Sequence, residues 1–189
     1  YDTAHTFACA HKDGLGILVL METGISRSEL LGLRWEDFDK DGGLLYIRQG
    51  LVQQKDSKTG KIVVVSDGLK NDHRRRVIPL HPDLVVRLSA KPRVILVGGN
   101  AKKGTKPTPV ITEHIFHAPG GGPFTPMNWT NRVFKPFMED LHAAHPDVPI
   151  LNPHELRHTR ATLWKDDGVD LFSIAKLLGH SDLDMLAKR

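Results

Sequence analysis

Apolar residues recur at helical spacing over much of the chain, and helices are therefore expected to dominate. This spacing predicts helices over residues 5–22 and 26–33. Gly14 and Gly16 weaken the first of them, because glycine lowers helix propensity. Further helices are predicted to begin at Pro82 and to cover about 126–143, 152–167, 170–178 and the residues from 181 onward.

Three short runs in the first half of the chain have the character of strands. They are Leu44–Arg48 and the residues just after it, Ile62–Val65, and Arg76–Leu80, with turn-forming residues at 56–60 and 70–72 between them. Residues 90–125 are rich in Lys, Pro and Gly and are predicted to be mostly loop. There is no alternation of strands and helices and no internal repeat. The expected fold class is mainly α with a small antiparallel β-sheet (α+β).

Composition and charge narrow the cellular setting. A net charge of +4 permits a polyanionic partner, although many proteins are mildly basic. The single cysteine, Cys9, excludes an internal disulfide and a multi-cysteine zinc site, and it fits a reducing cytoplasm. No apolar run reaches membrane-spanning length, so no membrane partner is expected. The chain starts at Tyr1 without an initiating Met, and we expect it to be a fragment of a longer protein.

The segment 152–158, Asn-Pro-His-Glu-Leu-Arg-His, carries the most chemistry. Asn152 is a favoured N-cap, and a Glu three residues later completes a capping-box pattern. His154 then lies in the first helical turn, where free backbone N–H groups favour an anion. Arg157 follows on the same face and can hold two phosphate oxygens at once. A surface helix with solvated charges is the simpler interpretation, because an isolated His-x-x-Arg is common.

The same segment also matches the zinc-protease pattern His-Glu-x-x-His. Its two histidines, His154 and His158, are four residues apart and would share a helix face. The context disfavours metal, because Pro153 places the first histidine at the helix start and Arg157 and Arg160 would repel a cation. We therefore expect no metal site.

Two further segments are weak signals when each is taken alone and become informative only in combination with the other motifs. In Leu177-Leu-Gly-His180, Gly179 is suited to end a helix, so that His180 would begin the next turn. Taken alone, this is usually a simple helix-ending loop. Lys70 stands in a turn before a basic run, and with His73, Arg74, Arg75 and Arg76 it could contact DNA phosphates. The alternative is a solvated, basic hairpin.

In their order and spacing, these motifs resemble the catalytic domain of tyrosine recombinases, the phage integrase family. The similar segments are residues 23–39, Lys70 ahead of 76–80, His154-Glu-Leu-Arg-His-Thr159 and Leu177-Leu-Gly-His-Ser181. They extend over nearly the whole chain, so the combined signal is specific although each motif alone is weak. The resemblance implies that residues 1–189 form a recombinase catalytic domain, with DNA-binding domains upstream and the nucleophile-bearing segment downstream both absent.

The family's activity is site-specific integration or excision of a mobile element, with DNA strands cut and rejoined through a 3′-phosphotyrosyl intermediate. The resemblance implies that Arg157 stabilises charge on the phosphate, that Lys70 is the general acid, and that His154 and His180 assist at the phosphate. It implies no cofactor, because the covalent intermediate conserves the bond energy. The implied partners are double-stranded DNA and other protomers, which form a tetramer on DNA.

Two positions depart from the family pattern. An arginine is expected two residues after Gly24, but Ser26 occupies that position. Arg27 follows it about 100° further around the helix and is the candidate catalytic residue in its place. The tyrosine nucleophile is expected about nine or ten residues after His180, yet the only tyrosines are Tyr1 and Tyr46. We therefore expect this chain to be inactive alone. The alternative hypothesis is a catalytically dead relative that binds DNA without cutting it.

Overall fold

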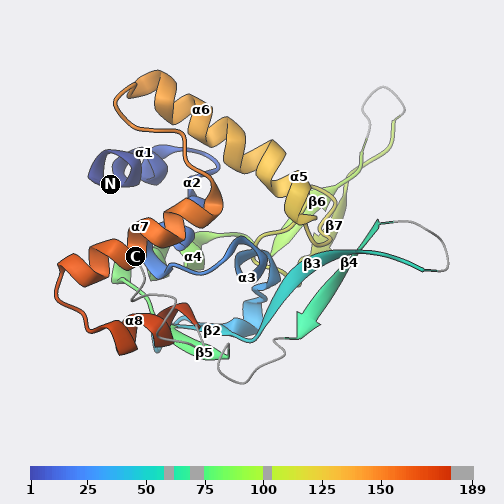
Figure 1. Cartoon of the computed structure of the whole chain (residues 1–189). Coiled ribbons are helices and arrows are strands. Elements are labelled where there is room, and N and C mark those ends of the chain that lie inside the picture. The colour runs from blue at the N-terminus through green and yellow to red at the C-terminus, as the bar shows by residue number, and fades with distance from the viewer. Residues whose placement is uncertain (58–61, 69–74, 100–103, 180–189) are drawn as a thin grey trace.

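The computed structural model describes residues 1–57, 62–68, 75–99 and 104–179, in which helices pack around small antiparallel sheets (Figure 1). The helices are α1 (Asp2–Ala10), α2 (Gly14–Thr23), α3 (Arg27–Gly32), α4 (Pro82–Ala90), α5 (Pro126–Trp129), α6 (Lys135–Ala144), α7 (Pro153–Asp166) and α8 (Leu171–Leu178). A 3-10 turn, η1 (Trp35–Asp37), follows α3, and a π-helical segment, η4 (Thr130–Phe134), joins α5 to α6. The predicted α+β class is confirmed.

The strands form three separate antiparallel units rather than one sheet. The strands are β1 (Phe38–Asp39), β2 (Leu44–Ile47), β3 (Gln49–Lys55), β4 (Ile62–Gly68), β5 (Arg76–Pro79), β6 (Val94–Val97) and β7 (Thr108–Ile111). In the three-stranded sheet the order is β1-β2-β5, with Leu45 opposite Ile78, while β3–β4 and β6–β7 are hairpins. Both hairpins project on the side of the view away from α7 and α8 (Figure 1).

The prediction of one helix over residues 5–22 was wrong. The chain ends α1 at Ala10 and starts α2 at Gly14, so the two helices meet at a tight turn. At Gly14 a Cβ atom would lie 1.9 Å from the carbonyl oxygen of Ala8. Only glycine allows the backbones to approach this closely, so the residue that weakened the predicted helix is the one that breaks it.

Residues 90–125 are also more regular than predicted. The run Val94-Ile-Leu-Val97 pairs with Thr108–Ile111 in antiparallel register. β-branched and aliphatic residues favour strands, and the Pro- and Gly-rich residues that dominated the composition lie mostly outside the two strands. The loop prediction therefore missed the β6–β7 hairpin.

Helix α2 forms the centre of the hydrophobic core. Ile17, Leu18, Val19 and Leu20 are each at most 1% exposed, as expected for a helix that is apolar on all sides. The helix ends at Gly24, whose positive φ of 64° turns the chain sharply toward α3. This turn places the start of α3 beside α7. No helix within the described ranges combines the length and apolarity needed to cross a membrane.

Candidate active site

The predicted helix start at Asn152 is confirmed. The Asn152 side chain accepts hydrogen bonds from the backbone N–H groups of His154 (2.9 Å) and Glu155 (3.1 Å). In return the Glu155 carboxylate accepts from the Asn152 N–H at 2.6 Å. The capping box fixes the first turn of α7, with His154 exposed on it. Arg157 comes one turn later and is turned into the protein.

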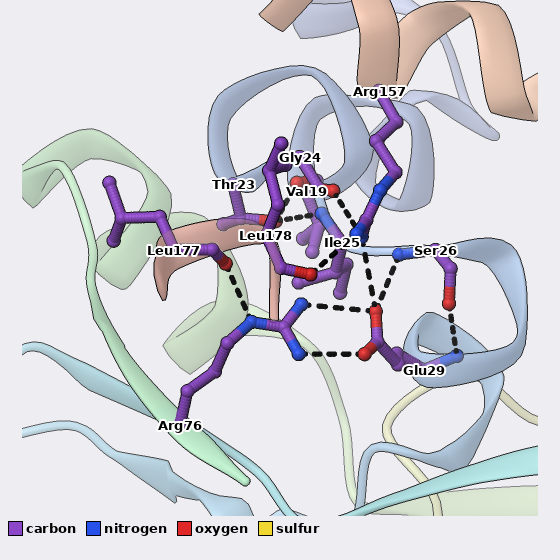
Figure 2. Close-up of polar contacts among 10 residues, drawn as sticks. All are labelled: Val19, Thr23, Gly24, Ile25, Ser26, Glu29, Arg76, Arg157, Leu177 and Leu178. Carbon is purple, nitrogen blue, oxygen red and sulfur yellow. Dashed lines mark hydrogen bonds and ion pairs between the residues drawn. The ribbon is translucent and has the colours of Figure 1, made fainter. Parts of the chain in front are cut away.

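Arg157 lies at the junction of three segments that are distant in sequence. Its side chain donates to the carbonyl oxygens of Gly24, at 3.0 Å, and of Leu178. Its Nη1 atom is also 3.6 Å from the Glu29 carboxylate, and the residue is only 8% exposed. The predicted arginine therefore connects the end of α2, the start of α7 and the end of α8 (Figure 2).

Glu29 is a buried residue that the sequence interpretation did not identify. Figure 2 shows its carboxylate between the guanidinium groups of Arg76 and Arg157. Arg76 donates to both carboxylate oxygens, at 2.7 and 3.1 Å, and its Nε donates to the Leu177 carbonyl at 2.6 Å. Burial raises the pKa of Glu29, but the hydrogen bond and charge of Arg76, the Ser26 N–H and the charge of Arg157 outweigh it and hold that pKa below the ordinary value.

These three charged side chains form a buried cluster, which we call the buried triad (Glu29, Arg76 and Arg157). Among the described residues, both guanidiniums face the single carboxylate of Glu29. A charge held in a low-dielectric interior acts more strongly on a nearby anion than one in water does. Arg157 can therefore act strongly on an anion that reaches the surface above it.

Arg76, which the sequence grouped with the residues that could contact DNA phosphates, lies inside the protein. Its side chain is 4% exposed and binds Glu29 inside the protein, whereas the neighbouring Arg75 is exposed. Burial alternates along β5, where Arg76 and Ile78 face inward and Val77 and Pro79 face outward. This two-residue period, with Arg76 in phase with an isoleucine, was the sequence signal for burial.

An open pocket lies over Arg157 and brings together residues from α3, η4 and α7. It has a volume of about 380 Å³ and is lined by Ser26, Arg27, Ser28, Thr130, Asn152, Pro153, His154 and Arg157. The lining contains two arginines and a histidine but no carboxylate. A pocket with these side chains is suited to bind a phosphate group.

The remaining predicted residues lie at or beyond the limits of the described structure. Lys70, His73, Arg74 and His180 lie outside the described residues. The structure does describe Gly179, which ends α8 with a left-handed φ of 70°. The carbonyls of Leu177 and Leu178 hold Arg76 and Arg157, so the chain reaches the triad immediately before His180.

The histidines of the alternative zinc motif are in contact. The ring centroids of His154 and His158 are 4.3 Å apart in an edge-to-face arrangement. Within the described ranges, no group of three or more His, Cys, Asp or Glu residues is placed to hold a metal ion.

The sequence of the chain is similar to those of known recombinases. The phage integrase family model matches residues 1–189. A curated tyrosine recombinase XerC-like protein of Caldanaerobacter subterraneus is 27% identical over 177 residues, which cover 90% of this chain and 43% of the relative. Tyrosine recombinase XerC of Bacillus licheniformis is 31% identical over 164 residues, which cover 87% of this chain and 44% of that protein.

Solved structures share the fold. The Tn1549 transposon integrase in complex with transposon right end DNA aligns over 99% of this chain and 58% of its own, with a TM-score of 0.76 and 21% identity. The XerH site-specific recombinase bound to difH substrate aligns over 97% and 46%, with a TM-score of 0.61 and 18% identity. The chain thus spans less than half of the curated relatives and little more than half of the Tn1549 integrase chain.

Proposed function

The chain belongs to the phage integrase family, and we propose that it is the catalytic domain of a tyrosine recombinase that cuts and rejoins double-stranded DNA. The observation that carries this proposal is the convergence of Arg27, His154 and Arg157 on one pocket whose lining contains no carboxylate. In the intact protein this domain would work with upstream DNA-binding domains and other protomers, as a tetramer on DNA, in the cytoplasm. The biological outcome would be integration or excision of a mobile element.

The pocket would act on the scissile phosphodiester. Arg157 would stabilise the negative charge that grows on the non-bridging oxygens, and it is preorganised for this role because two carbonyls and Glu29 fix its position. His154, in the first turn of α7, would hydrogen-bond to the same phosphate. Lys70 would protonate the departing 5′-oxygen, and His180 would assist from the end of α8.

The nucleophile in this reaction is a tyrosine hydroxyl, which displaces the 5′-oxygen and forms the 3′-phosphotyrosyl bond. The chain's own tyrosines are poorly placed for that step. Tyr1 donates its hydroxyl hydrogen bond to the Met21 carbonyl, and Tyr46 lies in β2 beneath the guanidinium of Arg48. Neither lines the pocket. Residues 1–189 alone should therefore bind DNA without cleaving it.

The surface beside the pocket supports DNA as the partner. The helix that runs on from Thr130 exposes Asn131, Arg132 and Lys135. Residues 126–138 contain no Asp or Glu, and the first carboxylate on this helix is Glu139. Arg, Lys and Asn are the side chains that contact phosphates and base edges. The half of the helix nearest the pocket is therefore compatible with a DNA backbone.

Duplex binding by this chain, measured by fluorescence anisotropy over a range of salt concentrations, tests the proposal. Binding should weaken steeply with salt, and Lys135→Ala should lower the slope of log K against log salt by about 1. Glu139→Gln is the matched control on the same helix and should not lower affinity. Salt-insensitive binding, or none, would rule out the DNA partner.

A catalytically dead DNA-binding relative is the second candidate, and Ser26 in the place of an arginine is the observation that favours it. A longer form of the protein that supplies the tyrosine separates the two. Incubated with nicked duplex DNA, a recombinase forms a covalent adduct that survives denaturing electrophoresis. A binder retains salt-sensitive affinity but yields no adduct.

A further inference from the structure

Ser26 cannot replace the arginine expected at its position, because its polar groups are already used within α3. Its hydroxyl accepts a hydrogen bond from the Glu29 N–H at 3.3 Å, and its own N–H donates to the Glu29 carboxylate at 2.7 Å. This reciprocal pair is a capping box that starts the helix. The short neutral side chain brings no positive charge to the pocket.

Arg27, the next residue, is directed to the pocket by a contact from a distant segment. Its Nη1 donates to the Thr130 hydroxyl at 2.8 Å, and both residues line the pocket together with His154 and Arg157. Thr130 is the first residue of the π-helical segment η4, a distortion that is often found at functional sites. The contact fixes a long side chain that would otherwise sample many rotamers.

The charge of Arg27 is not neutralised by a neighbour in the described ranges. Arg76 and Arg157 both face the Glu29 carboxylate, but no carboxylate within those ranges lies within 4.0 Å of the Arg27 guanidinium. Burial lowers the pKa of Arg27, and an arginine still remains protonated at neutral pH. A guanidinium has five N–H donors, so the single bond to Thr130 leaves most of them for a ligand.

We propose that Arg27, positioned by Thr130, supplies the second guanidinium that binds the scissile phosphate, in place of the arginine absent at Ser26. This inference rests on the proposed function, since it assigns a phosphate to the pocket. Arg27 would touch the non-bridging oxygens directly and is a catalytic residue in that sense. Thr130 is a positioning residue, because it acts only by orienting the guanidinium.

Orthovanadate, a tetrahedral oxyanion that mimics phosphate, provides a direct probe. Its affinity for the chain can be measured by calorimetry at low ionic strength, with thermal unfolding as a parallel measure of folding. Arg27→Gln should weaken binding by about ten- to a hundredfold, the usual effect of losing a charged hydrogen-bond donor. Thr130→Val should weaken it less, and Thr130→Ser, which keeps the hydroxyl, should restore it.

Arg87→Gln is the matched control, since it removes the same charge from an exposed position on α4 that does not line the pocket, and it should leave vanadate affinity unchanged. The inference is overturned if Arg27→Gln binds vanadate as the parent does, or if Arg27→Gln and the control variant lose affinity equally. It is also overturned if the folded parent does not bind vanadate. These outcomes leave the salt-dependent DNA binding and adduct formation of the proposed function unaffected, so the two failures are distinguishable.

Discussion

Replacing Arg76 by methionine tests whether this residue is internal or a surface contact to DNA. Methionine keeps the length and the apolar stem but removes the hydrogen bonds to the Glu29 carboxylate and to the Leu177 carbonyl. Breaking a buried ion pair by removing one partner costs about 3–5 kcal/mol, because a buried charge is left uncompensated. Arg157 remains 3.6 Å from the same carboxylate and reduces that cost. We therefore expect a loss of about 3 kcal/mol.

The loss is measurable by urea unfolding followed by circular dichroism. In a domain of this size, about 3 kcal/mol corresponds to a fall of about 6–12 °C in the melting temperature. Arg75→Met is the matched control, since it removes the same side chain from the adjacent exposed position. It should change the free energy of unfolding by less than about 0.5 kcal/mol.

Two results would refute the internal role of Arg76. One is an Arg76→Met protein as stable as the Arg75→Met protein. The other is a variant of unchanged stability that loses DNA affinity, because that pattern belongs to a surface phosphate contact. The expected pattern is the reverse, in which a large loss of stability follows Arg76→Met and only Arg75→Met reduces the salt dependence of DNA binding.

Two further changes test the groups around the pocket. Because the folded-state pKa of Glu29 is below its ordinary value of 4.5, the stability it contributes is complete above that pH and is lost as pH falls through the folded-state value. The free energy of unfolding should therefore decline in acid more steeply for the parent than for Glu29→Gln, and parallel curves would contradict this. Asn152→Ala removes the cap of α7 and should cost about 1 kcal/mol in the same unfolding assay. The exposed Asn131→Ala serves as its control, and equal losses in both would refute the capping role.

Features set by local sequence were predictable. The capping box at Asn152 depends on four consecutive residues, and it forms as the pattern indicates. The end of α8 at Gly179 is local in the same way. Tertiary contacts limited the other predictions. The break at Gly14 depends on the backbone of Ala8 passing beside it, which no helical period of the sequence reveals.

The site itself was only partly predictable for the same reason. The family resemblance placed Arg157 and His154 in the site, but Glu29 was missed although it stands in a Ser-x-x-Glu capping pattern with Ser26. A capping glutamate is usually exposed, and only the approach of Arg76 and Arg157 explains its burial. Arg76 was grouped with possible DNA contacts because it ends a run of basic residues. Its alternation with Ile78, which shares its buried face of β5, was given too little weight. Thr130 is more than a hundred residues from Arg27, and nothing in the sequence pairs them.

The charges around the pocket explain why Arg27 matters more than Ser26 to the proposed chemistry. Arg27 and Arg157 both line the pocket, and a ground-state phosphodiester carries a single negative charge. Attack at phosphorus adds a second negative charge in the transition state, and catalysis requires interactions that are stronger there than in the ground state. Arg27 would place a second guanidinium beside the oxygens on which this added charge grows. A chain without Arg27 would keep Arg157 to bind the substrate but would lose this added stabilisation. Loss of Arg27, rather than the presence of Ser26, would therefore convert a recombinase into a binder.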